Sequence, residues 1–146
     1  MILLDVNIVL AAHRSDHPHH AEVRSWFDEI VHGGEPFTVP DVVWAGFIRL
    51  STNRRIFPVP TPLEDAFGFL RAVRGQPHHV NVVPGERHLQ LFEDLCVTAD
   101  AAGDLAPDAY LAALALEQGC ELISMDRDFA RFPTLRWRRP EASTPR

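Results

Sequence analysis

The chain has 146 residues, 46% of them hydrophobic, which is enough for one compact core and too little for two. Its balance is acidic, with 20 Asp and Glu against 14 basic residues and a formal net charge of −6, which excludes a protein that binds nucleic acid through its overall field. All 14 basic residues are arginine, because the sequence contains no lysine. Any contact with nucleic acid is therefore expected to be local, through a basic rim or through a metal ion that reverses the sign of an acidic pocket.

The cysteines and the start of the chain bear on the compartment. Cys96 and Cys120 form no Cys-x-x-Cys pair and no disulfide-scaffold spacing, so we expect reduced thiols. The start of the chain lacks the charged and apolar regions of a signal peptide, and no run approaches the about 18 apolar residues of a membrane span. These features predict a cytoplasmic protein that does not enter a membrane.

The first half of the chain alternates apolar runs with helical patterns. Ile2 to Val6 is almost wholly apolar, which is typical of a parallel strand buried on both faces. A helix is predicted from the cap and early proline at residues 16–18, through apolar positions at helical spacing, to Gly33. Phe37 to Val39 is expected as a second strand, and a further helix is expected from Pro40 to Asn53.

The second half continues this alternation. A helix is predicted from Pro62 to Gly75, and another from Glu86 to Ala102. Between them, Val80 to Val83 has a β-like composition. A stretch rich in alanine and leucine begins at Pro107 and ends at Gly119, and a buried strand is expected at Leu122 to Ser124.

Short strands that alternate with helices imply βαβ units, in which a parallel sheet lies between two layers of helices. We therefore expect an α/β protein, a three-layer α/β/α sandwich with a short, mainly parallel central sheet. The sequence has no internal repeat and no low-complexity segment, so residues 1–139 are expected to form one domain. Residues 140–146 are expected to be a flexible tail.

Four acidic residues are expected at one edge of this sheet. In open α/β sheets, ligands bind beyond the carboxyl ends of the strands, near the point where the strand order reverses. Asp5 lies at the carboxyl end of the first strand, Asp126 and Asp128 follow the last, and Asp108 lies in the first turn of a helix that points toward the same edge. Converging carboxylates repel each other unless a hard cation neutralises them, and oxygen-only ligation suits Mg²⁺ or Mn²⁺. Such an ion can activate water and stabilise the charge of a phosphodiester in its transition state, which is the outline of a nuclease site.

These acidic residues also have structural interpretations. Asp108 suits a helix amino terminus on dipole grounds, and either Asp126 or Asp128 could cap the turn that follows it. Asp5 is harder to explain in this way, because a carboxylate that ends an apolar strand is costly to bury without a partner. The spacing alone leaves the function open.

Taken together, the motifs resemble the PIN-domain toxins of the VapBC type. Four segments carry the resemblance, in order and across nearly the whole chain: Leu4 to Asn7, Trp44 to Asn53, Pro107 to Ala115, and Ser124 to Phe129. The resemblance implies a PIN-like fold and a Mg²⁺- or Mn²⁺-dependent endoribonuclease that cuts structured RNA, often tRNA or rRNA. It also implies the toxin of a type II toxin–antitoxin system, neutralised by a cognate VapB-like antitoxin and commonly homodimeric.

The resemblance assigns roles by position. Asp5 and Asp108 would be the principal metal ligands, Asp126 would complete the catalytic and metal site, and Asp128 would be a secondary acidic member. Asn7 would orient Asp5 or a metal-bound water by hydrogen bonding.

One position departs from the family pattern. Gly46 stands where many such enzymes carry a glutamate of the acidic set. Asp41 is the nearest acid in that segment, but five residues of helix correspond to roughly 140° of rotation and more than one turn of rise, so we do not expect it to substitute. Either the metal binds through fewer protein ligands and more water, or this member is weakened. The glycine also leaves space that a substrate could use.

Arginine side chains can donate two hydrogen bonds to one phosphate. They are therefore candidates for an RNA rim, a basic edge of the pocket that contacts the RNA backbone. The candidates near the expected pocket are Arg49, Arg136, Arg138 and Arg139. The run from Arg136 to Arg139 is the best of them.

Two alternatives to a nuclease stay open. One is a phosphoacceptor receiver domain or an aspartate-nucleophile phosphatase, although both generally use a lysine and the phosphatase signature places a second aspartate where Asn7 stands. The other is a PIN-like module that has lost efficient catalysis and mainly binds RNA or its antitoxin, which Gly46 would explain. Metal-dependent cleavage that disappears in Asp5→Ala would separate the nuclease from this binding module.

Overall fold

A computed structural model describes residues 1–141 of the chain. Four short strands form one sheet in the order β2-β1-β3-β4, and every pairing is parallel. The strands are β1 (Ile2–Leu4), β2 (Phe37–Thr38), β3 (Glu121–Ile123) and β4 (Trp137–Arg138). The chain passes from β1 to a neighbour on one side and returns to β3 on the other, so the strand order reverses between β1 and β3.

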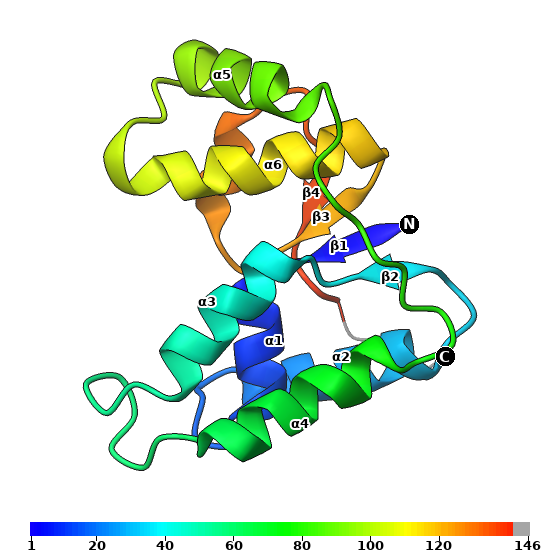
Figure 1. Ribbon diagram of the computed structural model, residues 1–146, viewed down its shortest axis with the longest axis vertical. Coiled ribbons are helices and arrows are strands. Elements are labelled where there is room, and N and C mark those ends of the chain that lie inside the picture. Colours follow the sequence, from blue (N-terminus) through cyan, green and yellow to red (C-terminus); the bar gives the residue numbers. More distant parts are fainter. Residues whose placement is uncertain (142–146) are drawn as a thin grey trace.

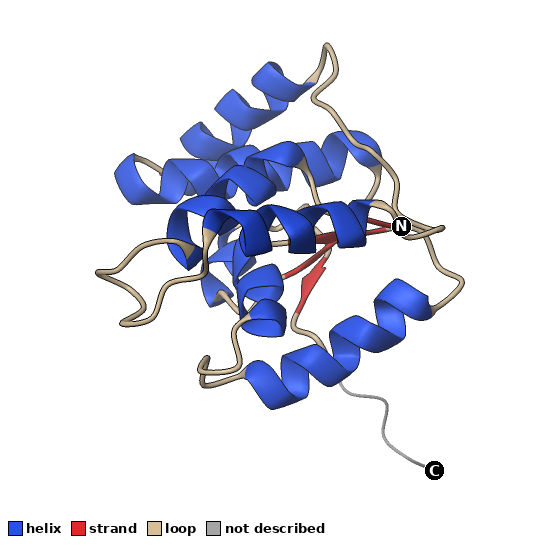
Figure 2. Ribbon diagram, turned by 60° about the horizontal axis from the view of Figure 1, so that its bottom comes forward, coloured by secondary structure: helices blue, strands red, loops and turns tan. Residues whose placement is uncertain are grey.

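Helices cover both faces of the sheet. Figure 1 shows the first four helices gathered on one side of it and α5 and α6 on the other, and Figure 2 shows the strands enclosed between helices. Within residues 1–141 the α-helices are α1 (Val6–His13), α2 (His20–His32), α3 (Asp41–Ser51), α4 (Leu63–Arg74), α5 (His88–Ala99) and α6 (Ala106–Gln118), and the 3-10 helices are η1 (Gly103–Leu105) and η2 (Arg127–Arg131). The predicted three-layer α/β/α arrangement with a parallel sheet is confirmed. None of the helices in this part of the chain is long and apolar enough to cross a membrane.

Helix α1 begins directly after β1, where the sequence analysis had predicted a strand as far as Val6. The strand ends at Leu4, and Asp5 caps the helix by accepting a hydrogen bond from the Val6 amide at 2.7 Å. Residues 8–12 of α1 are buried without interruption. A helix that is buried all round has no apolar and polar faces, so its sequence lacks the periodicity that reveals a helix.

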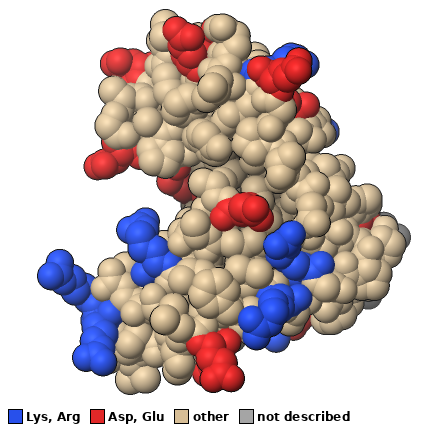
Figure 3. All heavy atoms as spheres, viewed as in Figure 1, with Lys and Arg blue, Asp and Glu red and all other residues tan. Residues whose placement is uncertain are grey.

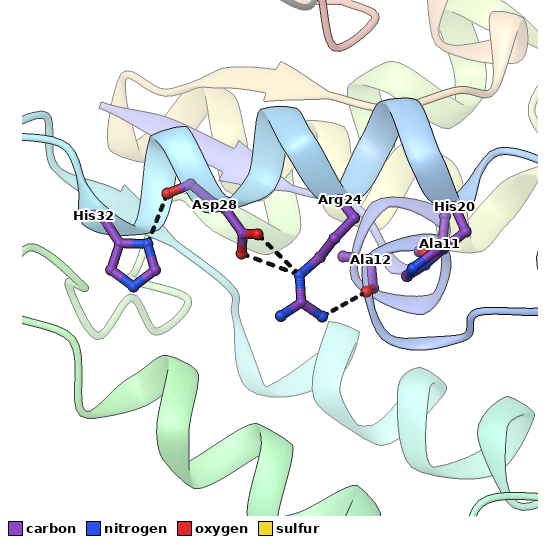
Figure 4. Close-up of polar contacts among 6 residues, drawn as sticks. All are labelled: Ala11, Ala12, His20, Arg24, Asp28 and His32. Atoms are coloured by element: carbon purple, nitrogen blue, oxygen red, sulfur yellow. Dashed lines mark hydrogen bonds and ion pairs between the residues drawn. The ribbon is translucent and has the colours of Figure 1, made fainter.

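Side chains of α2 hold the carboxyl end of α1 (Figure 4). Arg24 donates to the carbonyl oxygen of Ala12 at 3.1 Å, and Nδ1 of His20 lies 2.8 Å from the carbonyl oxygen of Ala11. Asp28 in turn pairs with Arg24 at 3.0 Å. These contacts satisfy carbonyl groups that a helix end leaves without intrahelical partners, and they fix the helix that starts at the sheet edge.

Helix α6 packs against the sheet through small side chains. Its fully buried alanines are Ala109, Ala112, Ala113 and Ala115. Gly119 ends the helix with a φ of 67°, a left-handed conformation that favours glycine, and the chain then enters β3 at its amino end. The first turn of α6, which carries Asp108, therefore faces the carboxyl edge of the sheet.

Two strand predictions differ from the structure. Val80 to Val83 is not a strand: the isolated bridge between Phe37 and His79 ends just before it, and Val83 is 67% exposed just before Pro84. Conversely, Trp137–Arg138 forms β4, in a run that was predicted as a candidate RNA rim and not as a strand.

Helix boundaries and the tail differ from the predictions more modestly. Helix α2 begins at His20 rather than at residues 16–18, and α5 is shorter at both ends than the predicted range 86–102. Most of the predicted tail, residues 142–146, lies outside the described residues.

Candidate active site

Asp5 is buried between β1 and α1 at the carboxyl edge of the sheet, with 8% of its surface exposed. Its Oδ1 accepts the hydrogen bond from Val6, and its Oδ2 accepts one from the Ser124 hydroxyl at 2.7 Å and one from Asn7 Nδ2 at 3.2 Å. Burial raises the pKa of Asp5, the hydrogen bonds from Ser124 and Val6 oppose that rise, and the charge of Asp126 adds to it. Both oxygens are thus held in one orientation.

Ser124 joins the two central strands at this edge. It directly follows β3 and is fully buried. Its hydroxyl donates to Asp5 and accepts from Asn7 Nδ2 at 3.0 Å and from the Asp126 amide at 3.0 Å, which uses its one donor and two acceptor positions. No role for Ser124 was predicted from the sequence, although a small hydroxyl residue at the carboxyl end of a central strand was an available signal.

Asn7 completes the connection between the two strand ends. Its amide nitrogen reaches Asp5 and Ser124, while its Oδ1 accepts a hydrogen bond from the Met125 amide at 3.1 Å. The first turn of α1 is therefore tied to the segment that follows β3.

Three further carboxylates gather beside this network. One oxygen each of Asp108, Asp126 and Asp128 lies within 4.8 Å of the others. Asp126 caps η2 by accepting from the Asp128 amide at 2.9 Å, and Asp128 is exposed, with an oxygen 3.8 Å from Arg131 Nε. Asp108 accepts no hydrogen bond from any described residue, and α6 has no side-chain cap, so a capping role does not account for Asp108.

The electrostatics of this cluster are unfavourable without a counter-charge. Partial burial, followed by the charges of Asp126, Asp5 and Asp128, raises the pKa of Asp108 to about 7. Hard oxygen donors in excess of neighbouring positive charge are the environment that a divalent cation such as Mg²⁺ or Mn²⁺ relieves. The donor set therefore fits the expected metal.

The predicted metal ligands were Asp5, Asp108 and Asp126. The structure brings Asp108 and Asp126 together with Asp128, and it sets Asp5 next to them, close enough that its charge raises the pKa of Asp108. Because both oxygens of Asp5 already accept hydrogen bonds, Asp5 differs from the other three in how freely it can coordinate.

A cavity of about 370 Å³ opens between α3 and the start of α6. Its lining residues are Asp5, Val6, Val42, Val43, Ala45, Gly46, Arg49, Pro107, Asp108 and Leu111. Gly46 therefore faces the same cavity as two of the acidic residues.

The four candidate RNA-rim arginines do not share one location. Arg49 lines the cavity. Arg139 lies 3.9 Å from the sulfur of Met125, after the end of β4. Arg138 pairs with Glu121 at 2.7 Å, and Arg136 donates to the carbonyl oxygen of Gly119 at 3.1 Å, near the opposite, amino edge of the sheet.

Charge divides the face of the molecule drawn in Figure 3. Acidic side chains lie mainly over the half built from α5 and α6, and basic ones lie mainly over the half built from α3, α4 and their connection. The surface is hollowed between the two halves. A polyanion that approaches this hollow would meet positive charge on the α3 side.

Known proteins share both the sequence and the shape of this chain. The sequence profile of the PIN domain matches residues 2–135. Ribonuclease VapC25 of Mycobacterium tuberculosis is 58% identical over 140 residues, which are 96% of this chain and 99% of that protein.

Two solved structures share the fold at low identity. VapBC2 from Rickettsia felis, bound to a DNA fragment from its promoter, has a TM-score of 0.67 at 15% identity and covers 97% of this chain and 100% of that one. VapC20 from M. tuberculosis, described as a sarcin-ricin loop cleaving toxin, has a TM-score of 0.63 at 14% identity and covers 89% and 93%.

The raised pKa of Asp108 predicts a pH-dependent stability. Its folded value of about 7 lies above the ordinary value of 3.8, so the folded state disfavours the charged form, and stability is lost as pH rises between these values. In EDTA, Asp108→Asn should therefore raise the thermal midpoint at pH 8 by an amount on the order of 5 °C, allowing for solvent screening, and by clearly less at pH 5. Asp104→Asn, in the exposed turn before α6, removes an equal charge and serves as the control. An equal gain at both pH values would contradict the prediction.

Proposed function

Because the chain belongs to the PIN-domain family, we propose that it is an endoribonuclease that hydrolyses RNA phosphodiester bonds with a Mg²⁺ or Mn²⁺ ion at the carboxyl edge of its sheet. The observation that carries the proposal is the cluster of three carboxylates within 4.8 Å, next to buried Asp5. The ribonuclease name of a relative that is 58% identical over nearly the whole chain supports the reaction. The absence of lysine from the sequence argues against the phosphotransfer alternatives.

Each acidic residue has its own part in the proposed site. Asp108, Asp126 and Asp128 would hold the cation, with Asp5 at the side of the cluster. When bound, the ion supplies positive charge beside the scissile phosphate and acidifies the water that attacks it. With a pKa of about 7, Asp108 is protonated below neutral pH, so binding of the cation there would be linked to proton release.

The buried network keeps the site ready for this chemistry. Three hydrogen bonds fix the Asp5 carboxylate, and Asn7 and Ser124 hold it at a constant distance from the segment that carries Asp126. Such preorganisation lowers the cost of assembling the reacting groups. We expect in-line hydrolysis that leaves a 5′-phosphate and a 3′-hydroxyl.

We further propose that the protein is the toxin of a type II toxin–antitoxin pair that acts in the cytoplasm on structured RNA such as tRNA or rRNA. A cognate VapB-like antitoxin would neutralise it by laying a segment across the cavity, with a basic side chain against the acidic cluster. Proteins of the same fold that are named as VapBC and as a loop-cleaving toxin support this role. The family resemblance also implies a homodimer.

Metal-dependent cleavage of RNA tests the proposal. Purified protein freed of antitoxin should cut total bacterial RNA into discrete fragments with Mg²⁺ or Mn²⁺ and not with EDTA. Asp108→Asn should reduce the rate by about 100-fold or more, because loss of a carboxylate removes charge stabilisation in the transition state. An Asp5→Ala, Asp108→Ala double variant should be inactive, and Asp104→Asn should match the wild type. If the wild type binds RNA and metal without cutting the RNA, the protein is a PIN-like binding module and not an active nuclease.

Among the four candidate arginines, Arg49 should matter most for RNA. Arg49→Gln should weaken RNA binding by about 5- to 10-fold and lower the slope of log affinity against log salt by about one, because one phosphate contact is lost. Arg136→Gln should change affinity by less than about two-fold, since that guanidinium bonds Gly119 at the far edge. Fluorescence titrations over a salt series measure both. A larger effect at Arg136 would show that RNA follows the other edge of the sheet.

A further inference from the structure

The cavity beside the acidic cluster has a mixed chemical character. Its charged lining residues are Asp5, Asp108 and Arg49, and the rest of its lining is apolar. The apolar lining comes from α3 on one side and from Val6, Pro107 and Leu111 on the other. At about 370 Å³ it falls within the roughly 300–1,000 Å³ of small-molecule sites. A metal ion and its bound waters would gain no favourable interaction from these apolar walls.

Gly46 makes this cavity larger without being needed for packing. A Cβ atom placed there would lie 3.4 Å from Val6 Cγ2 with nothing nearer, whereas one at Gly33 would lie 2.8 Å from a backbone oxygen. The φ of Gly46 is also not positive, so the backbone does not require glycine. Glycine is a poor helix former, so neither helix propensity nor packing explains its presence within α3. Its effect there is to leave empty space in the wall of the cavity.

Arg49 gives the cavity one positive charge that is not engaged elsewhere. It follows Gly46 by three residues on α3, on the same face, and it is exposed. Among the described residues it makes no hydrogen bond and no ion pair, in contrast to Arg14 and Arg24. An unpaired guanidinium beside a mainly acidic and apolar cavity is complementary to a phosphate that enters with an apolar group.

We propose that this cavity receives the base of one unpaired nucleotide next to the scissile phosphate of the RNA. The inference rests on the proposed ribonuclease function and adds a subsite for one base of its substrate. The phosphate would lie toward the acidic cluster, Arg49 would contact a neighbouring phosphate, and the faces of the base would pack against the apolar walls.

The occupant follows from the pairing of these features. A nucleotide carries a phosphate and a flat group with apolar faces at a short fixed separation. In an A-form duplex that group stays stacked and paired, so it cannot enter a cavity of this kind. Enzymes that do chemistry on a base show that an extruded base can be held in a pocket, packed between aromatic or apolar side chains. The cavity therefore requires that the base beside the cut be unpaired when it binds.

A double-variation cycle, in which Gly46 of the protein and one base of the RNA are changed separately and together, tests the inference. An RNA that the wild type cleaves is prepared in its parent form and with an abasic nucleotide on either side of the cut. For the wild type, one abasic position should lower kcat/KM by about 10-fold or more, because base packing is lost. Gly46→Leu fills the cavity, so it should cleave the parent RNA about 10-fold more slowly and cleave the abasic RNA within two-fold of the parent. Gly68→Leu makes the same change in open space on α4 and should behave as the wild type.

The outcomes separate the inference from the function on which it rests. Cleavage of the parent RNA by the wild type tests the ribonuclease function alone. An abasic effect of equal size in the wild type and in Gly46→Leu, or no abasic effect at either position, would overturn the subsite. If Gly46→Leu is inactive on every RNA, Gly46→Ala adds one methyl group that the 3.4 Å spacing tolerates, and its abasic effect should be intermediate.

Discussion

A buried hydroxyl group connects the carboxyl ends of the two central strands. The Ser124 hydroxyl donates a hydrogen bond to Asp5 and accepts hydrogen bonds from Asn7 and from the Asp126 amide. A buried carboxylate such as Asp5 is costly unless its oxygens are satisfied, so these bonds make it possible for α1 to start at this point. The same hydroxyl sets the backbone of Asp126. The small side chains of α6 then let that helix dock closely enough to bring Asp108 to the same edge.

The acidic cluster shows a conflict between stability and function. Partial burial and the charges of three neighbouring carboxylates raise the pKa of Asp108 and weaken the folded state at neutral pH when no cation is present. The protein keeps this arrangement, and hydrogen bonds from Ser124, Asn7 and Val6 hold Asp5 within it. A site that is unfavourable alone and favourable with a divalent cation is the physical basis of the proposed nuclease. The glycine in α3 adds room beside this charge instead of a further acid.

The sequence allowed the sheet class, most helices and the acidic edge to be predicted, because each rests on local patterns. Asp5 could be assigned to a strand end because an apolar run precedes it, and Asp108 to a helix start because a proline precedes it. Helix α1 escaped prediction because burial on all sides removes its periodicity. The two-residue strand β4 and the hydrogen bonds of Ser124 depend on pairing between distant segments, which no local pattern contains. The positions of Arg136 and Arg138 depend on the same pairing.

Crystals soaked in Mn²⁺ and measured at the manganese absorption edge test the central claim most directly, namely that these carboxylates hold a divalent cation. The account predicts an anomalous peak in contact with Asp108 and with at least one of Asp126 and Asp128, and no such peak in Asp108→Asn. A saturating soak of well-ordered wild-type crystals that leaves this cluster without a peak, or that places the ion elsewhere, would contradict the account.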